Sequence, residues 1–128
     1  MRRTVVAFML LVLSTLLLSA CVSSGNTSTS SPPKLEVAEL VFDLDDPVAP
    51  MVRGWASNVG GSAQYVELAF KITAPEDENI IYMSGWTNFT NFKRGEKRAF
   101  SIVLIGQPPE GDYSYHWRTS TTPGGAAY

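Results

Sequence analysis

Three observations predict that this chain forms an all-β domain, a β-sandwich of about seven short antiparallel strands. Apolar residues alternate with polar ones at a period of two in several segments, as in strands that bury one face. Clusters rich in glycine, proline, asparagine and aspartate recur between these segments, at intervals of about 8–12 residues. The spacing of apolar residues that is typical of helices is almost absent from this part of the chain.

The first half of the domain supplies three predicted strands. Residues 35–42 form the first and residues 51–59 the second, and the turn cluster at 58–62 provides a hairpin connection to the third, at 65–72. Gly54, in the middle of the second strand, indicates a bulge or the close approach of another backbone. The third strand is the clearest, because four apolar residues share one of its faces at i, i+2 spacing: Val66, Leu68, Phe70 and Ile72.

The second half continues the pattern with shorter segments. Residues 80–86 form a strand that is interrupted at its glycine, residues 99–105 form another, and residues 113–118 form the last. A turn at 92–96 and a break with two prolines at 106–111 separate them. Strands of this number and spacing are typical of an immunoglobulin-like β-sandwich, and a small β-barrel is the alternative.

The beginning of the chain has the layout of an export signal. Two arginines precede an apolar run at residues 5–18, and the small residues Ser19 and Ala20 stand directly before Cys21. The run is shorter than the roughly 20 residues that a membrane-spanning helix needs. The stretch from 18 to 21 resembles the lipobox of prokaryotic lipoproteins, and this resemblance implies that Cys21 is lipidated and becomes the first residue of the mature chain. A secreted protein with a free thiol and an uncleaved helical anchor are the alternatives.

These features divide the chain into four parts. Residues 1–20 are the predicted lipoprotein signal peptide, and residues 21–33, rich in serine, threonine and proline, are a flexible tether. Residues 34–118 form the predicted β-sandwich, and residues 119–128 a flexible tail. We therefore expect the domain to be anchored by lipid to the cell membrane or outer membrane and to face the extracytoplasmic side.

Composition limits the partners and the chemistry of the mature chain. After cleavage it would carry 8 basic against 12 acidic side chains, and this balance disfavours a nucleic-acid partner. Its single cysteine would hold lipid, so no disulfide stabilises the fold and an apolar core must do so.

Part of the chain resembles the FxLYD domain family of exported lipoproteins. Residues 52–60 are similar to its pattern of hydrophobic-x-Gly-x-hydrophobic-x-Asn-x-Gly, and residues 66–72 fit its second strand. The turn at 92–96, with a phenylalanine four residues later, is similar to its Leu-x-Pro-Gly-Glu turn. Thr73 and Ala74 replace the Tyr-Asp pair that names the family. The resemblance implies an immunoglobulin-like domain without shared catalytic residues, an extracytoplasmic interaction or spacer module.

Few residues suit catalysis or metal binding. His116 is the only histidine, and we expect it on the outward side of the last strand, away from any nucleophile. The acidic clusters at 43–46 and 76–78 offer oxygen ligands for calcium, but carboxylates exposed in turns are the interpretation that we favour. The basic residues at 93–98 either meet anionic groups at the envelope or form a solvated turn. We therefore predict no enzyme activity, no metal site and no cofactor.

Aromatic residues are more numerous than a small core needs, and they suggest a binding surface. Residues 86–92 interleave aromatic with polar side chains, and the candidate surface consists of Trp86, Phe89 and Tyr113. The alternative is that these rings belong to the core. The sequence therefore predicts a non-catalytic module that binds an envelope protein or acts as a spacer. A module that binds a glycan or an envelope polymer through exposed aromatic residues is the alternative function.

Overall fold

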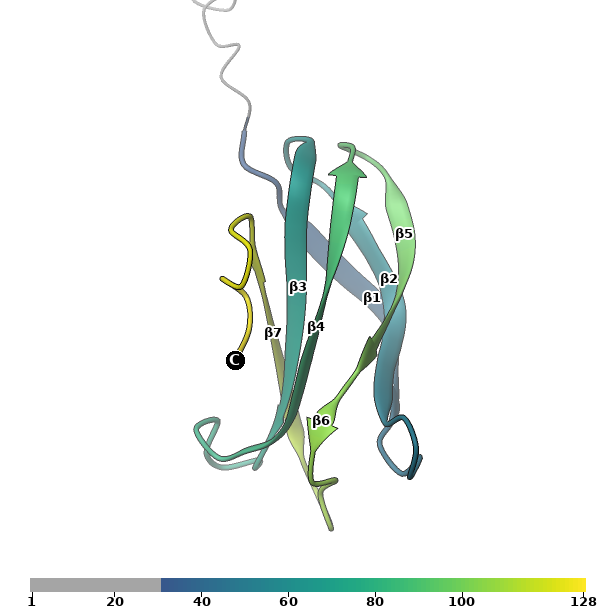
Figure 1. The fold of residues 1–128 in the computed structure, drawn as a ribbon, viewed down its shortest axis with the longest axis vertical. Helices are drawn as coiled ribbons and strands as arrows, with labels where there is room; N and C mark the ends of the chain where they lie inside the picture. The colour runs from purple at the N-terminus through teal and green to yellow at the C-terminus, as the bar shows by residue number, and fades with distance from the viewer. Residues whose placement is uncertain (1–30) are drawn as a thin grey trace, which may run out of the picture. The chain divides into compact units, whose positions relative to one another are not determined.

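A computed structural model describes residues 31–128, which consist of strands, turns and loops (Figure 1). The predicted signal peptide, Cys21 and residues 21–30 of the tether lie outside the described residues. In the described part, no helix is long and apolar enough to cross a membrane. The strands are β1 (Leu35–Asp43), β2 (Met51–Asn58), β3 (Ala63–Thr73), β4 (Ile81–Phe92), β5 (Lys97–Val103), β6 (Ile105–Gly106) and β7 (Ser114–Ser120).

The seven strands form two antiparallel sheets, which face each other in Figure 1. One sheet has the order β1-β2-β5 and the other the order β6-β4-β3-β7. The predicted all-β sandwich of about seven strands is thus confirmed, with two separate sheets. The core lies between them, and the four apolar residues predicted to share the inward face of β3 are all buried there: Val66, Leu68, Phe70 and Ile72.

One side of the sandwich is closed by a strand that changes sheets. The sequence predicted a single strand at 99–105, but the chain leaves the first sheet after Val103 and joins the second at Ile105. Between the two strands, the N–H of Leu104 donates to the carbonyl oxygen of Pro50 at 2.8 Å. The buried Leu104 side chain keeps this crossing inside the core.

The crossing also explains a glycine that the sequence analysis placed at a strand interruption. β4 runs without interruption through Gly85, so the prediction of a short strand at 80–86 was wrong in its length. A Cβ atom at Gly85 would collide with the carbonyl oxygen of Val103, at the end of β5. The glycine is therefore needed because the other sheet comes close at this point.

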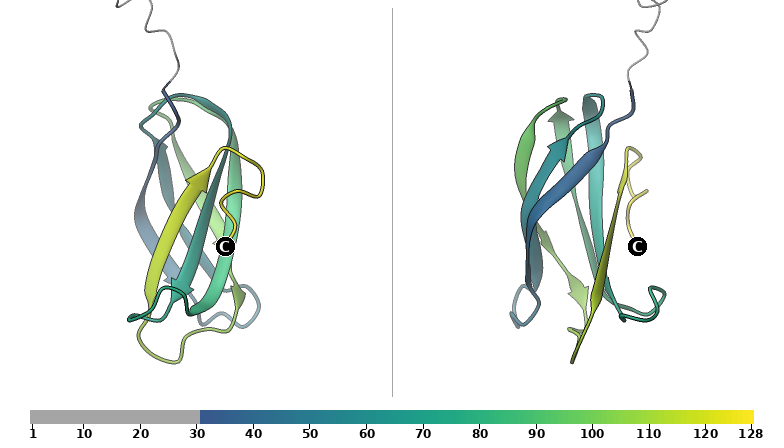
Figure 2. Two further views of the ribbon diagram at one scale, coloured as in Figure 1. Left: turned by 90° about the vertical axis from the view of Figure 1, so that its left-hand side faces the viewer. Right: turned by 180° about the vertical axis from the view of Figure 1, so that it is seen from behind.

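The opposite side, between β1 and β7, is not closed by any strand of the described part, and we call it the open side (Figure 2). β1 is irregular there: its pairing with β2 shifts between Ala38 and Val41, and Glu39 has a φ of 55°. Gly54 lies opposite this bulge, and a Cβ atom on it would come within 2.9 Å of the carbonyl oxygen of Ala38. The bulge and close approach predicted from Gly54 are both found, with the bulge on the neighbouring strand.

Asn58 holds together the end of the sandwich at which the described chain begins. Its buried side-chain amide donates to the carbonyl oxygens of Gly61 and Phe92, each at 3.0 Å, and its Oδ1 accepts the N–H of Gly60 at 3.1 Å. The turn at 58–62 is thus present, but the hairpin connection predicted there was wrong, because β2 and β3 belong to different sheets. Residues 31–34 pack so closely against Gly60 and Gly61 that a Cβ atom on either glycine would collide with their backbone.

The end of the chain is more ordered in structure than the sequence suggested. β7 continues to Ser120, beyond the predicted limit at residue 118, and residues 121–128 fold back beside the second sheet (Figure 2). We call residues 121–128 the tail. Nε of Arg118 donates to the carbonyl oxygen of Ala126 at 2.7 Å. The predicted flexible tail at 119–128 thus differs from the structure, because polar groups on the sheet hold its backbone.

Candidate interaction surfaces

The three residues of the predicted binding surface do not lie together. Trp86 is 48% exposed on β4, where it is opposite Ala69 on the outer face of the second sheet. Phe89 is 7% exposed and belongs to the core, because three residues further along β4 it points inward, with its ring 4.9 Å from that of Phe92. Tyr113 is 39% exposed and lies just before β7. The alternation at 86–92 therefore marks a strand rather than an aromatic shelf.

A different set of aromatic residues gathers on the open side. The ring of Phe42, from β1, lies 6.2 Å from the ring of Tyr113 and 4.8 Å from that of Tyr115. Trp117 follows two residues later on β7 and has the same inward orientation, because it pairs with Phe70. We call Phe42, Tyr113, Tyr115 and Trp117 the open-side aromatic cluster.

The cluster is half-exposed although its side chains point toward the core. Tyr115 and Trp117 are 45% and 36% exposed, whereas their partners on β3 are fully buried. The sequence signal for this cluster is the alternation in the last strand, which correctly places both residues on its inward face. The sequence does not reveal that β7 is an edge strand beside a gap, and for this reason it cannot predict their exposure.

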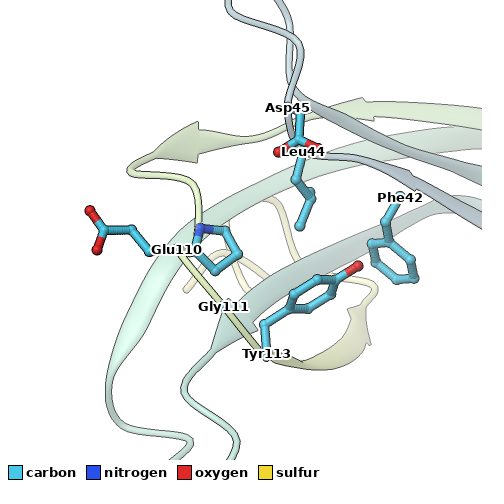
Figure 3. Close-up of a pocket in the computed structure, with 7 residues that line it drawn as sticks. Phe42, Leu44, Asp45, Glu110, Gly111 and Tyr113 are labelled. Carbon is cyan, nitrogen blue, oxygen red and sulfur yellow. The ribbon is translucent and has the colours of Figure 1, made fainter.

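A cavity of about 290 Å³ adjoins one end of the cluster (Figure 3). Phe42 and Tyr113 form one wall, and Leu44 and Asp45 lie across from them. The carboxylate of Glu110 points away from the cavity in Figure 3. A second open cavity, of about 510 Å³, is lined by Tyr82 and by the loop at residues 107–112. The cavity is small, and it extends the cluster rather than forming a separate deep site.

The outer face of the second sheet carries a buried carboxylate that binds the tail. Glu67, on β3, is fully buried and accepts hydrogen bonds from the Tyr65 hydroxyl, from the N–H of Gly124 at 2.8 Å and from the N–H of Ala126 at 3.2 Å. The Tyr65 hydroxyl and the Gly124 N–H lower the pKa of Glu67, against the effect of burial, which raises it. No local pattern predicts this role, since Glu67 has the position of an ordinary outward residue of a strand.

Cations surround the tail on the same face. The Arg118 guanidinium lies 4.1 Å from the centre of the Tyr128 ring and the Lys71 ammonium 4.9 Å from it. His116 lies on the outer face, as predicted, with Nδ1 3.7 Å from a carboxylate oxygen of Glu78. Neither of the two depressions at residues 107–112 includes His116. His116 and Glu78 thus form a partly exposed contact on the sheet surface.

In each of the two acidic clusters, an aspartate accepts hydrogen bonds from backbone N–H groups of its own turn. A carboxylate oxygen of Asp46 accepts the N–H groups of Val48 at 2.9 Å and Ala49 at 3.2 Å, and these bonds lower the pKa of Asp46. Asp77 in the same way accepts the N–H of Asn79 at 2.9 Å. Among the described residues, no group of three or more histidine, cysteine, aspartate or glutamate side chains is arranged to hold a metal ion. The favoured interpretation of these carboxylates as turn residues agrees with the hydrogen bonds.

Two of the basic residues at 93–98, Lys97 and Arg98, have partners within the domain. Arg98 binds both carboxylate oxygens of Glu96 at 2.9 Å, and it donates at 2.7 Å to the carbonyl oxygens of Thr90 and Asn91. The ammonium of Lys97 lies 4.9 Å from the centre of the Trp55 ring. Arg98 therefore ties the turn by which the chain passes from β4 in one sheet to β5 in the other, and its guanidinium is already engaged there.

The positions that carry the FxLYD resemblance have structural roles. Gly54 lies opposite the β1 bulge, Asn58 joins a turn to two strands, and Gly95 has a φ of 82° in the turn before β5. Such roles recur in β-sandwiches of different function, so the resemblance stays a prediction. Comparisons with protein-family models, with curated proteins and with solved structures found no match for this chain.

Proposed function

We propose that this protein is a lipid-anchored extracytoplasmic module that binds another protein at the cell envelope and catalyses no reaction. The single observation that supports binding over a purely spacing role is the open-side aromatic cluster. Tyr115 and Trp117 turn their rings toward the core, yet they remain 45% and 36% exposed. Aromatic residues at the centres of protein interfaces contribute much of the binding energy, because a partner removes their large apolar area from water.

The anchor follows from the sequence around Cys21. A diacylglyceryl group on this thiol would hold the mature chain at the membrane, since two acyl chains give stable anchoring where one gives only reversible binding. We expect Cys21→Ser to leave an unprocessed precursor or to release the protein, measured by membrane fractionation and intact mass. A normal mature mass in an unchanged membrane fraction would contradict lipidation.

The binding function is tested by mild crosslinking in native membranes, followed by capture of the full-length protein. We expect a specific protein partner with the wild-type chain, and at least a tenfold lower yield with Tyr115→Ala combined with Trp117→Ala, about the effect of losing 1.4 kcal/mol. Trp55→Ala is the matched control, because Trp55 is 38% exposed on the outer face of the other sheet, where it pairs with Ala38 and Ala99 and not with β7.

The alternative glycan-binding function makes a different prediction in the same experiment. It depends on Trp86, which is exposed among polar neighbours on the outer face of the second sheet, and no longer on the buried Phe89. Capture of a glycan that Trp86→Ala abolishes would support the alternative. If neither the wild-type protein nor any variant captures a protein or a glycan, a spacer role would be favoured.

A further inference from the structure

The charged residues of the domain are divided unequally between its two ends, which lie at the top and the bottom of Figure 1. Five basic and two acidic residues lie at the end where the described chain begins, which we call the tether end: residues 31–36, 58–63 and 92–98. Eight acidic residues and no basic one lie at the opposite end, which we call the distal end: residues 43–51, 73–81 and 103–114. The domain is therefore positive where the tether joins it and negative at its far end.

Backbone hydrogen bonds bring the basic residues of the tether end together. The N–H of Gly95, in the turn after β4, donates to the carbonyl oxygen of Asn58 at 2.7 Å. The N–H of Val59 donates to the carbonyl oxygen of Lys34 at 2.8 Å. The turns after β2 and β4 are thus joined to the residues just before β1. Four exposed basic residues therefore share this end of the sandwich: Lys34, Lys93, Arg94 and Lys97.

The carboxylates of the tether end do not cancel this positive charge. Both oxygens of Glu96 bind Arg98 at 2.9 Å, so these two residues neutralise each other. Glu36 is the other acidic residue there, and it lies one strand away from Lys97, because both pair with Ser57. In residues 31–128, no carboxylate forms an ion pair with any of the four exposed basic residues. With Glu36 counted against these four, the tether end keeps a surplus of three positive charges.

An anchor at Cys21 would hold the tether end nearer to the membrane than any other part of the domain. From Cys21 to Ser31 a fully extended chain spans at most about 36 Å. A membrane leaflet that contains anionic lipids attracts basic side chains within about one Debye length, ~8 Å at physiological salt. The tether is therefore long enough for the tether end to touch the headgroups, and short enough to keep it close to them.

The same reach argues against a second anchored copy as the partner of the tether end. The acidic residues of such a copy lie at its distal end, and the 12 residues of β4 place the two ends about 40 Å apart. For a distal end to meet the tether end of a neighbour, one of the two copies must hold its own residue 31 about 40 Å above the membrane. The tether reaches only about 36 Å. An anionic lipid surface is within reach and has the complementary charge.

We propose that the tether end docks on anionic lipid headgroups, with Lys34, Lys93 and Arg94 toward the membrane and the acidic distal end away from it. This inference rests on the anchor in the proposed function and adds an orientation to it. Each basic residue at the surface would strengthen docking about fivefold. The long axis of the sandwich would stand away from the membrane, so that the open-side aromatic cluster, on β1 and β7, would face a partner from the side.

The lysines of the chain can report this docking themselves. The chain from Cys21 to Tyr128 is coupled through its single thiol to a lipid headgroup in vesicles, so that the test does not depend on lipidation in the cell. The rate at which a soluble reagent acylates each lysine is measured by mass spectrometry. On vesicles of phosphatidylglycerol and phosphatidylcholine in equal parts, we expect Lys34 and Lys93 to react about tenfold more slowly than on phosphatidylcholine alone. Lys71, on β3, should keep its rate.

Salt and two charge-matched variants provide the controls. Sodium chloride at about 1 M, where the Debye length is ~3 Å, should remove the difference between the two kinds of vesicle. Lys93→Gln with Arg94→Gln should let Lys34 react on the mixed vesicles nearly as fast as on phosphatidylcholine. Arg53→Gln with Lys71→Gln removes the same charge from the sheets and should leave the slow reaction of Lys34 and Lys93 unchanged.

Several results would overturn the inference. Equal rates on both kinds of vesicle would exclude docking on lipid, and slowing of Lys71 to the same extent as Lys34 would exclude the proposed orientation. Slowing on phosphatidylcholine vesicles that increases with the density of coupled chain would indicate a second copy as the partner. Equal slowing by soluble polyglycerol phosphate on those vesicles would indicate an anionic polymer of the envelope.

Failure of the proposed function gives a different result. A normal mature mass of Cys21→Ser in an unchanged membrane fraction would contradict the anchor, whatever rates the lysines of the coupled chain have. If Cys21 is lipidated and a protein is captured through Tyr115 and Trp117, but the lysines react equally on both kinds of vesicle, the proposed function stands and the docking is wrong.

Discussion

The buried side-chain amide of Asn58 stabilises the domain through three hydrogen bonds. Its Nδ2 donates to two carbonyl oxygens and its Oδ1 accepts the N–H of Gly60, so that Asn58→Ala would leave buried polar groups without partners. Each such group costs about 1–3 kcal/mol. We expect the free energy of unfolding to fall by about 3 kcal/mol, measured by urea titration. Asn88→Ala, at an exposed position of β4, is the control and should change it little; equal effects would contradict the role of Asn58.

Glu67 makes docking of the tail dependent on pH. Its pKa is lowered in the folded protein because the Tyr65 hydroxyl and the Gly124 N–H donate to the carboxylate. A lowered pKa means that the ionised form stabilises the fold at pH values above the ordinary glutamate pKa, and that this contribution is lost as the pH falls through the lowered value. We therefore expect the amide protons of Gly124 and Ala126 to stay protected through the ordinary titration range of glutamate and to exchange freely below it.

Substitution of Glu67 distinguishes its charge from its shape. In Glu67→Gln, an NH₂ group replaces one of the two carboxylate oxygens that accept the tail N–H groups, and two donors then face each other. The tail amides should therefore exchange faster even at neutral pH, measured by NMR. Glu110→Gln, at an exposed loop residue, should leave them unchanged. Tail amides that remain protected in Glu67→Gln would show that Arg118 holds the tail without the carboxylate.

At the scale of elements, the passage of the chain from β5 to β6 depends on Gly85. A Cβ atom there would strike the carbonyl oxygen of Val103, a backbone atom that cannot rotate away. We expect Gly85→Ala to lower the free energy of unfolding by about 3 kcal/mol, measured by thermal or urea unfolding. Gly111→Ala is the matched control, because nothing lies within 4 Å of its added Cβ. An equal loss in both variants would contradict the close approach as the cause.

The sequence predicted best the strand that lies inside its sheet and buries one face in the core. β3 lies between β4 and β7, and its alternation of apolar residues gave its position and its inward face correctly. β4 was predicted too short, because a glycine inside a strand has the same local signature whether the strand ends or another strand approaches it. The crossing at Leu104 was not predicted, because alternation continues through residues 100–104 while the pairing partner changes.

For the molecule as a whole, the difference between its two sides predicts a gradient of local stability. β3 is paired on both edges and its inward residues are fully buried, whereas β7 is paired on one edge and its inward aromatic residues are half-exposed. We expect native-state amide exchange to be slowest in β3 and at least tenfold faster in β7, about 1.4 kcal/mol in opening free energy. Uniform protection of both strands would contradict this view of the open side.

The candidate surface shows the limit of inference from the sequence at this scale. The residue types were anticipated, since aromatic side chains do form the exposed cluster, but of Trp86, Phe89 and Tyr113 only Tyr113 belongs to it. An aromatic ring near the edge of a sheet is exposed or buried according to whether a further strand lies beside its own strand. This depends on the order of strands in the sheet. The buried role of Glu67 depends on the return of the tail from 57 residues away, which no local pattern encodes.

The contacts of residues 31–34 have a mechanical consequence. The N–H of Val59 bonds to the carbonyl oxygen of Lys34 at 2.8 Å and the N–H of Gly61 to that of Pro32 at 3.0 Å, beside the Asn58 side chain. For a domain held from its N-terminal side, tension would load these bonds together with the ladder of β1 against β2. Force along a pair of antiparallel strands stretches many hydrogen bonds at once instead of opening them one by one. In the lipid-anchored chain that we propose, the bonds of residues 31–34 and the β1–β2 ladder would therefore resist tension in shear.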